Sequence, residues 1–339
     1  MRRVVVLGGQ GLFGGTILDR LRVLGVPAIV AGRRGAEIIA DADDPDSLHR
    51  AFRSGDVVVD AAGPFQRRTL ALVEAAIRTG FDVVDINDNL SYAEQLLAQS
   101  SRIQNAGIRV LSSASSVSAV SALAVKQSGI RAPVSVQTVL APASRHTANR
   151  GSALSLIQSI GQPVRTLRDG KLESLRGGSE SRRMALPEPL GTIRGWLFES
   201  ADAVYLPLIW PTLRDVNMYV DTNTPGVNGL LRCGARSPAL RRMLESQVSL
   251  GTRISRIFGA TRGGLGYEIR SADGPLARVV VFSDEASYVT AVAPAVLAAH
   301  SLAHDEFELE GLIRPDQHVS GNELLRYLDK CGIRVAMAA

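Results

Sequence analysis

Glycine spacing near the start of the chain predicts a binding site for the pyrophosphate of a dinucleotide. Gly9, Gly11 and Gly14 fit the pattern G-x-G-x-x-G, directly after an apolar run and before a helical pattern. Glycines in this place permit a tight turn, close approach of the backbone to phosphate and close packing of helix on strand. An unliganded glycine turn is the alternative. We expect the nucleotide to contact a glycine loop made of Gly8, Gly9, Gly11, Leu12, Phe13 and Gly14.

The residues after the second apolar run indicate which nucleotide this is. The run ends in Gly32, Arg33 and Arg34, where a site for NAD usually carries an acidic residue. Arginine can instead pair with the 2′-phosphate of NADP. The pattern therefore favours NADP(H), with two solvated turn residues as the alternative. Asp41 is expected to lie near the adenine, unless it caps a helix.

Short β-branched runs alternate with helical patterns over the first 111 residues. This alternation is typical of βαβ units and of a parallel sheet covered on both faces. Open sheets of this kind bind ligands at the carboxyl ends of their strands. We therefore predict an α/β fold with a Rossmann-type doubly wound parallel sheet. Its strands are expected at 3–7, 27–31, 37–40, 57–61, 83–86 and 109–111, and its helices between them, including 46–52, 68–79 and 91–104.

Chemistry-bearing residues follow the later strands at that same edge. Asp85 follows the fifth strand and is the first candidate for a catalytic group. Ser115 and Ser116 follow the sixth strand and offer hydroxyl and N–H donors to a substrate, or ordinary helix capping. Asp88 and Asn89 are further substrate-binding candidates, although Asp88 could simply start a turn. The turn after the fourth strand is expected to lie against the nicotinamide ribose and phosphate, and comprises Ala62, Gly63, Pro64 and Phe65.

After about residue 116 the pattern changes to fewer, longer strands separated by loops rich in glycine and proline. Residues 165–189 show little apolar periodicity and suggest a long surface excursion. Before them, His146 could protonate a substrate oxygen or nitrogen, although a lone surface histidine is commoner. Arg145 and Arg150 lie beside it. The basic excess over 131–183 hints at an anionic small-molecule substrate, and a solvated face explains it almost as well.

Taken together, these segments resemble the saccharopine dehydrogenase-like family. The likeness rests on the glycine loop and on segments 31–33, 56–65 and 82–86, and continues weakly through 150–153, 169–171 and 189–191 into 310–315. It implies an NADP-dependent oxidoreductase whose chain leaves the nucleotide domain, builds an α+β mixed-sheet substrate domain and returns through a helix at 286–303. The implied domains are 1–116 with 285–339 for the dinucleotide, and 117–284 for substrate binding or dimerisation.

One segment departs from that family. Saccharopine reductases usually carry a glycine, an acidic residue, a proline and a glycine after the sixth strand, whereas residues 112–118 here read SSASSVS. The acidic group is missing, so an amino-acid substrate does not follow from the resemblance. We expect hydride transfer to a C=N, C=O or activated C=C bond of an unidentified substrate. A non-catalytic NADP-binding sensor or regulatory protein is the rival hypothesis.

Composition narrows the remaining classes. The formal net charge is +5, but only three of the 38 basic residues are lysines and no basic run is interleaved with aromatics, which argues against nucleic acid. The longest uncharged stretch of interest, 286–299, is too short to cross a bilayer, and we expect no membrane partner. Two cysteines give neither a disulfide framework nor a metal site. A cytoplasmic location is expected, and the sequence leaves open whether the protein forms a homodimer.

Overall fold

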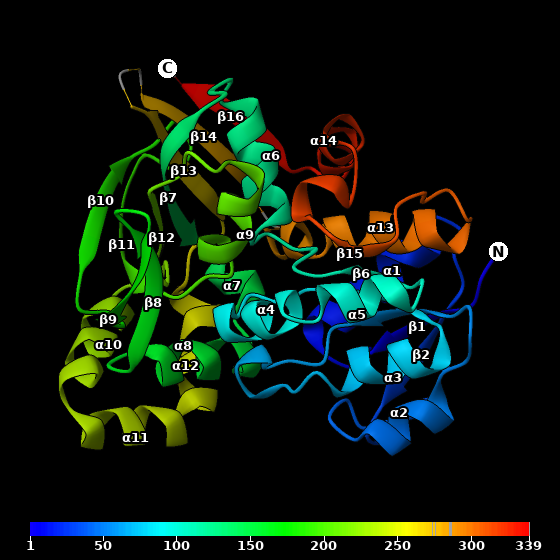
Figure 1. The fold of residues 1–339 in the computed structure, drawn as a ribbon. Helices are drawn as coiled ribbons and strands as arrows, with labels where there is room; N and C mark the ends of the chain where they lie inside the picture. Colours follow the sequence, from blue (N-terminus) through cyan, green and yellow to red (C-terminus); the bar gives the residue numbers. More distant parts are fainter. Residues whose placement is uncertain (273, 275, 285–286, 339) are drawn as a thin grey trace. The chain divides into compact units, whose positions relative to one another are not determined.

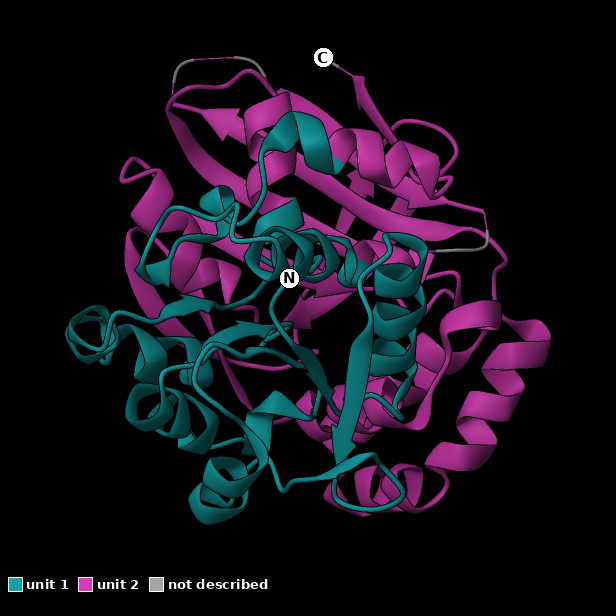
Figure 2. Cartoon of the chain, turned by 90° about the vertical axis from the view of Figure 1, so that its right-hand side faces the viewer, with its two compact units in different colours: residues 1–120, 291–324 teal, residues 121–290, 325–339 magenta. Residues whose placement is uncertain are grey.

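The computed structural model describes residues 1–272, 274, 276–284 and 287–338. The chain divides into two compact units (Figure 2). Unit 1 comprises Met1–Val120 and Ala291–Leu324, and unit 2 comprises Ser121–Thr290 and Leu325–Ala339.

Unit 1 is built on a parallel sheet that has seven strands among the described residues (Figure 1). The strand order is β15-β6-β5-β4-β1-β2-β3, and every neighbouring pair is parallel. The order reverses between β1 and β4, which is where open doubly wound sheets bind ligands. The predicted Rossmann-type sheet is therefore confirmed. Its strands are β1 (Val4–Leu7), β2 (Ala28–Gly32), β3 (Ile38–Ile39), β4 (Val57–Asp60), β5 (Asp82–Asp85), β6 (Arg109–Leu111) and β15 (Gly311–Ile313).

The three central strands of this sheet, β1, β4 and β5, are buried along their whole length because helices cover both faces. One core cluster joins Val5, Val58 and Val83 to apolar side chains of the helices on one face. On the other face α13 (Ala293–Ala303) packs against α1 (Leu12–Val23) and against β4 and β5. The remaining helices of unit 1 are α2 (Pro45–Ala51), η1 (Phe65–Arg67), α3 (Ala71–Thr79), α4 (Leu90–Leu97), α5 (Ser100–Asn105) and η3 (Pro315–Gln317).

Unit 2 is built on a mixed sheet with nine strands in the described part of the chain. Its main path is β10-β11-β12-β7-β13-β14-β16, in which β12 and β7 are parallel and the other pairs antiparallel. A hairpin of β8 and β9 branches from β12. The strands are β7 (Pro133–Ala141), β8 (Pro163–Arg168), β9 (Lys171–Arg176), β10 (Ser181–Ala185), β11 (Thr192–Phe198), β12 (Asp215–Val220), β13 (Gly263–Ser271), β14 (Leu276–Ser283) and β16 (Arg334–Ala338).

Helices lie on and beside this second sheet, and several were not predicted. The stretch from 227 to 258 forms three successive helices where the sequence suggested only loops and strands. Helix α6 (Ala119–Gln127) begins at the boundary of the two units and α14 (Gly321–Lys330) crosses the other boundary. The others are α7 (Ser144–Thr147), α8 (Arg150–Ser159), α9 (Asp202–Ile209), α10 (Val227–Arg236), α11 (Pro238–Ser246), α12 (Val248–Phe258) and η2 (Ser287–Ala291).

Two sequence predictions need correction here. The surface excursion expected at 165–189 is wrong, because β8, β9 and β10 occupy it; β9 is largely exposed, so its strand carries no apolar alternation. The domain boundary also differs at the C-terminus, since β16 completes the second sheet by pairing with β14 and residues 325–339 therefore cluster with unit 2. The helix predicted at 286–303 is observed as η2 and α13, and residues 285 and 286 lie outside the described residues.

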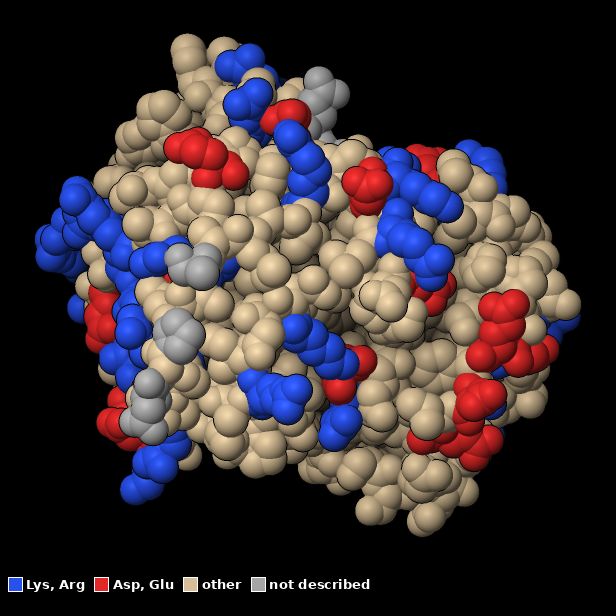
Figure 3. All heavy atoms as spheres, turned by 90° about the horizontal axis from the view of Figure 1, so that it is seen from above, with Lys and Arg blue, Asp and Glu red and all other residues tan. Residues whose placement is uncertain are grey.

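Positive and negative side chains are mixed on the molecular surface (Figure 3). Lysine and arginine side chains are interspersed with carboxylates over the face seen in Figure 3. Within the described ranges, no helix combines the length and the apolar content that crossing a bilayer requires.

Candidate functional site

The glycine loop between β1 and α1 is packed so closely that side chains are excluded. Gly8 has φ +81°, and a Cβ there would lie 2.8 Å from the Ala62 backbone nitrogen. A Cβ on Gly14 would lie 2.7 Å from the Cα of Gly9 and would also overlap the carbonyl oxygen of Gly8. Gly8 thus allows the end of β1 to lie against the turn after β4, and Gly14 allows the start of α1 to rest directly on the glycine loop. Of the roles that the G-x-G-x-x-G pattern assigns to glycine, close packing of the helix on the strand therefore has a geometric basis at Gly14.

The N-terminus of α1 is open to an anion. Gly11 is its N-cap residue, no side chain caps it, and its first turn carries no acidic residue. Gln10, Gly11 and Leu12 are exposed. The first N–H groups of a helix have no partner within the helix, and the helix dipole gives this end a partial positive charge. A phosphate is the ligand class that such an end accepts best.

The turn after β2 supplies two exposed cations beside the glycine loop. Arg33 and Arg34 are exposed and form no ion pair with any described residue. The Gln10 side-chain amide donates a hydrogen bond to the Gly35 carbonyl oxygen at 2.6 Å, which ties the glycine loop to this turn. Glu37, the next carboxylate along the chain, accepts a hydrogen bond from the Val30 N–H at 3.1 Å. The glycine loop and the turn after β2 are therefore joined, and phosphate binding by the two of them stays a prediction.

Asp41 occupies a tight turn after β3. Its carboxylate accepts a hydrogen bond from the Asp43 N–H at 3.1 Å. The cap of α2 is Asp44, whose carboxylate accepts from the N–H groups of Asp46 and Ser47. The capping role considered for Asp41 therefore falls to another residue, and its placement near the adenine stays a prediction.

A buried ion-pair network holds the turn after β4, and the sequence reasoning did not find it. Arg68 donates to an Asp60 carboxylate oxygen at 3.1 Å and to the Ala62 carbonyl oxygen at 2.7 Å. Its Nε reaches Asp43 at 3.0 Å. Although burial lowers the pKa of Arg68, the charge of Asp60 raises it above its ordinary value and keeps the guanidinium charged. The network fixes residues 61–64 relative to the segment after β3.

At the end of this turn, the Phe65 side chain packs into the core of unit 1. Its ring is buried and packs edge-on against Tyr92, with 5.4 Å between the ring centroids. The preceding Gly63 is exposed, whereas Ala62 and Pro64 are half-buried, and the Gly63–Pro64 peptide is cis. The backbone of residues 62–64, rather than the Phe65 side chain, is therefore the part that a cofactor could contact.

Asp85 is fully buried at the carboxyl end of β5. One of its oxygens accepts hydrogen bonds from the Ser113 N–H at 2.8 Å, the Asn87 N–H at 3.0 Å and the Ser112 hydroxyl at 3.0 Å. Its other oxygen has no hydrogen-bond partner among the described residues. Burial raises the pKa of Asp85 to about 6, against the lowering effect of these hydrogen bonds. Asp85 thus joins the loops after β5 and β6 from inside the unit.

The polar residues after Asp85 are organised by Asn87, which the sequence reasoning passed over. Asn87 is buried and accepts a hydrogen bond from the Asn89 N–H at 2.8 Å. Asn89 caps α4 through the Tyr92 N–H at 2.9 Å, so much of its hydrogen-bonding capacity is used locally. Asp88 is exposed. The available signal in the sequence was an asparagine two residues after an aspartate at the end of a predicted strand.

The serine segment after β6 is largely internal. Ser115 is buried and its hydroxyl donates to the Val117 carbonyl oxygen at 3.1 Å, whereas Ser116 is half-buried. Ser113 and Ser118 both adopt positive φ, at 59° and 69°. The segment is thus a tight turn leading into α6, and Ser116 is the more accessible of the two predicted serines.

The three remaining candidates belong to unit 2. Arg145 and His146 lie on the short helix α7 and are exposed, as is Arg150 at the start of α8. The Arg145 guanidinium donates to the Ile257 carbonyl oxygen at 3.0 Å. These three residues therefore lie together in unit 2, whereas all the other candidates lie in unit 1. Their role in one shared site stays a prediction.

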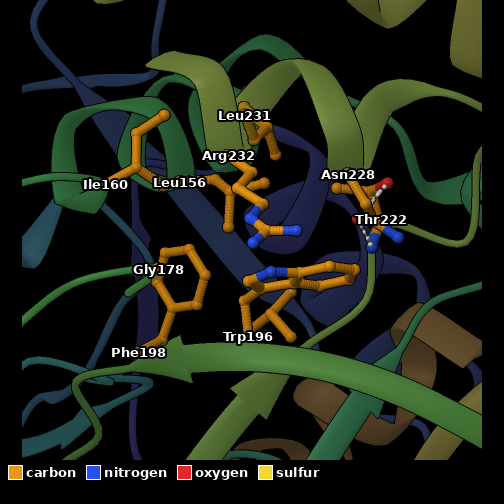
Figure 4. A pocket seen from close by; sticks show the side chains of 10 residues that line it. Leu156, Ile160, Gly178, Trp196, Phe198, Thr222, Asn228, Leu231 and Arg232 are labelled. Carbon is orange, nitrogen blue, oxygen red and sulfur yellow. Dashed lines mark hydrogen bonds between the residues drawn. The ribbon is translucent and has the colours of Figure 1, made fainter. Parts of the chain in front are cut away.

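Unit 2 also contains a narrow slot that the sequence did not predict (Figure 4). Trp196 and Phe198 of β11 form one wall, and Leu231 and Arg232 of α10 lie opposite. Thr222 and Asn228 are hydrogen-bonded at its polar end. The free space is about 10 Å³. That volume holds roughly one water molecule, so the slot takes no substrate in this conformation.

The buried Asp85 carboxyl leads to a pH-dependent prediction. A folded-state pKa of about 6, above the ordinary value, means that its contribution to stability is present at low pH and is lost as the pH rises from about 4 to about 6. We expect the free energy of unfolding of Asp85→Asn, relative to the parent, to rise on the order of 2 kcal/mol between pH 4 and pH 7.

Urea unfolding of both proteins across this pH range measures that difference. Using the difference removes the opposing effect of buried His318, whose pKa is lowered to about 4 by burial in both proteins. A difference that does not change with pH would show that Asp85 is ionised at the same pH in the folded and unfolded chains.

An open helix N-terminus at the reversal point of a doubly wound parallel sheet, with cations at the end of the second strand, defines a dinucleotide-binding Rossmann domain. Residues 4–111 match the family model of the saccharopine dehydrogenase NADP binding domain, so this segment is an NADP-binding domain of that family. The resemblance found in the sequence is confirmed for this segment.

Other comparisons are more distant. A lipid droplet localized protein of Caenorhabditis elegans is 28% identical over 135 residues, 32% of each chain, so this chain matches about a third of that relative's length. Among solved structures, the WlbA dehydrogenase of Thermus thermophilus is 12% identical, with 96% of this chain and 94% of that chain covered and a TM-score of 0.40. A triphenylmethane reductase of Citrobacter is 17% identical, with 75% and 89% covered and a TM-score of 0.29. Such low scores carry no argument about the site.

Proposed function

We propose that the protein is an NADPH-dependent oxidoreductase that reduces a C=N, C=O or activated C=C bond of a small, anionic substrate. The observation that carries the proposal is an uncapped helix N-terminus joined, through Gln10 and Gly35, to a turn whose two arginines form no ion pair with any described residue. The first part suits a pyrophosphate and the second a 2′-phosphate. A site for a simple mononucleotide would need only the first.

Each part of unit 1 has a definite task in this proposal. The N–H groups at the start of α1 bind the pyrophosphate, and Arg33 with Arg34 binds the 2′-phosphate. The backbone of residues 62–64 contacts the nicotinamide ribose, and Asp41 lies near the adenine. The bound nicotinamide supplies the hydride.

Substrate handling needs groups that the cofactor does not provide. Asp85 is a positioning residue in this account, because it is fully buried and acts through Ser112, Ser113 and Asn87. Ser116, the more accessible serine, is proposed to donate to the substrate with Asp88, Asn89 and Ser115. His146 is proposed as the proton donor, and Arg145 with Arg150 as the anion-binding pair. A carbonyl oxygen or an imine nitrogen needs such a donor within about 3 Å.

Isotope transfer tests the proposal. The protein is incubated with NADPH deuterated at C4, in turn on each face of the ring, and with a set of anionic keto acids, imines and enoyl compounds. We expect deuterium from one face alone to appear in a reduced product. A protein that binds NADPH tightly and reduces no member of the set would support the rival hypothesis of a sensor.

A further inference from the structure

Helix α12 exposes an apolar stripe to solvent. Leu250, Ile254, Ile257 and Phe258 are 53%, 40%, 61% and 64% exposed. Their spacing of i, i+4, i+7 and i+8 places them on one face of the helix. In most helices of globular proteins, the face with this spacing points to the core. Here it is the opposite face, with Val248 and Thr252, that is buried.

The stripe is part of a larger amphipathic segment. Helix α12 packs on α7 and α8, and α10 and α11 precede it without a strand between them. Leu230 on α10 and Met243 on α11 are also exposed, at 44% and 52%. Large apolar side chains exposed on three successive helices are unlike the single exposed residues that any surface carries.

The charge on this segment is predominantly positive. Residues 227–258 hold six arginines and one carboxylate, Glu245, a net charge of +5 that equals the formal charge of the whole chain. Arg253 is exposed within the stripe's own helix. The Arg256 Nε donates to the Ala148 carbonyl oxygen at 3.0 Å, which fixes one cation beside α8. Exposed apolar residues flanked by arginine are typical of helices that lie in the interface of a membrane.

We propose that helices α10 to α12 dock on the surface of an anionic phospholipid bilayer, with the α12 stripe inserted among the lipids and the arginines at the headgroups. A second copy of this chain fits the stripe less well, because a symmetric contact would bring the same net charge of +5 against itself. The sequence expectation of no membrane partner rested on the lack of a stretch long enough to cross a bilayer, and docking on the bilayer surface needs no spanning helix.

Vesicle cosedimentation with the full chain tests the proposal. We expect binding to phosphatidylcholine vesicles that contain phosphatidylserine and little binding to phosphatidylcholine alone, with loss at high salt. Because burying one large apolar side chain strengthens binding about tenfold or more, removing two with Ile257→Ser and Phe258→Ser should weaken partitioning at least about a hundredfold. Arg253→Glu should weaken it about twentyfold, since each cation near an anionic surface adds about fivefold.

The matched control is Val23→Ser with Met337→Ser, which removes two exposed apolar side chains, 76% and 59% exposed, from elsewhere on the surface. It should bind vesicles as the parent does. NADPH titration and the unfolding midpoint establish that all variants are folded. Absence of parent binding to phosphatidylserine vesicles, or equal losses in the stripe variant and the control, would overturn the proposal. So would a parent dimer that only the stripe variant dissociates, because the stripe would then be an interface between copies.

Discussion

Replacing Gly14 by alanine is expected to abolish measurable NADPH binding. The new Cβ would lie 2.7 Å from the Cα of Gly9 and overlap the Gly8 carbonyl oxygen, so α1 has to move away from β1. That movement takes the helix N–H groups out of reach of the pyrophosphate. Hydrogen bonds to charged groups contribute about 1.5 to 3 kcal/mol each, and the loss should weaken NADPH by at least about a hundredfold. Fluorescence titration with NADPH measures it.

Gly15 provides the matched control in the same helix. A Cβ on Gly15 meets its nearest neighbour, the Gly9 carbonyl oxygen, at 3.7 Å, which is ordinary van der Waals contact. Gly15→Ala should therefore bind NADPH as the parent does, and both variants should retain the parent's far-UV circular dichroism. Parent-like NADPH affinity in a folded Gly14→Ala variant would show that the pyrophosphate is bound elsewhere.

The second large effect is expected from Arg33→Asp. This change removes a charge-assisted pair with the 2′-phosphate, places a carboxylate against it, and offers that carboxylate to the ribose hydroxyl of NADH. The ratio of NADPH affinity to NADH affinity should fall by about a hundredfold or more, because the substitution weakens the binding of NADPH and strengthens the binding of NADH. Paired titrations of the variant with the two cofactors give the ratio directly.

Arg22→Asp is the control for net charge. Arg22 lies near the C-terminal end of α1, its side chain is 81% exposed, and it pairs only with Asp19 among the described residues. The substitution changes the net charge by the same amount and should leave the ratio unchanged. Equal falls in the two variants would mean that the whole protein's field, and not contact with Arg33, selects the cofactor.

The parallel sheet could be predicted from the sequence because local signals and tertiary burial agree there. β1, β4 and β5 are nearly continuous valine runs with buried side chains throughout, as strands covered on both faces must be. The glycine loop was predicted for the same reason, since each glycine answers a local steric requirement. Both features depend on few residues that are close together in the chain.

The parts that escaped prediction depend on partners far away in sequence. Arg68 lies at the start of a predicted helix, and only the fold brings it to Asp43, 25 residues earlier, and to Asp60. The apolar spacing of α12 is helical, but Gly251 and three serine or threonine residues dilute it, and its orientation toward solvent is a tertiary property. The burial of Asp85, on which its proposed positioning role depends, could not be predicted from its place at the end of β5.

Comparing NADPH and NADH in titrations of the unmodified protein tests the central claim most directly. The account predicts tighter binding of NADPH than of NADH, by about tenfold or more. The two cofactors differ only in the 2′-phosphate, and this is the group that Arg33 and Arg34 are proposed to bind. Equal affinity for the two cofactors would contradict it, and would leave the arginines as solvated residues of the turn after β2.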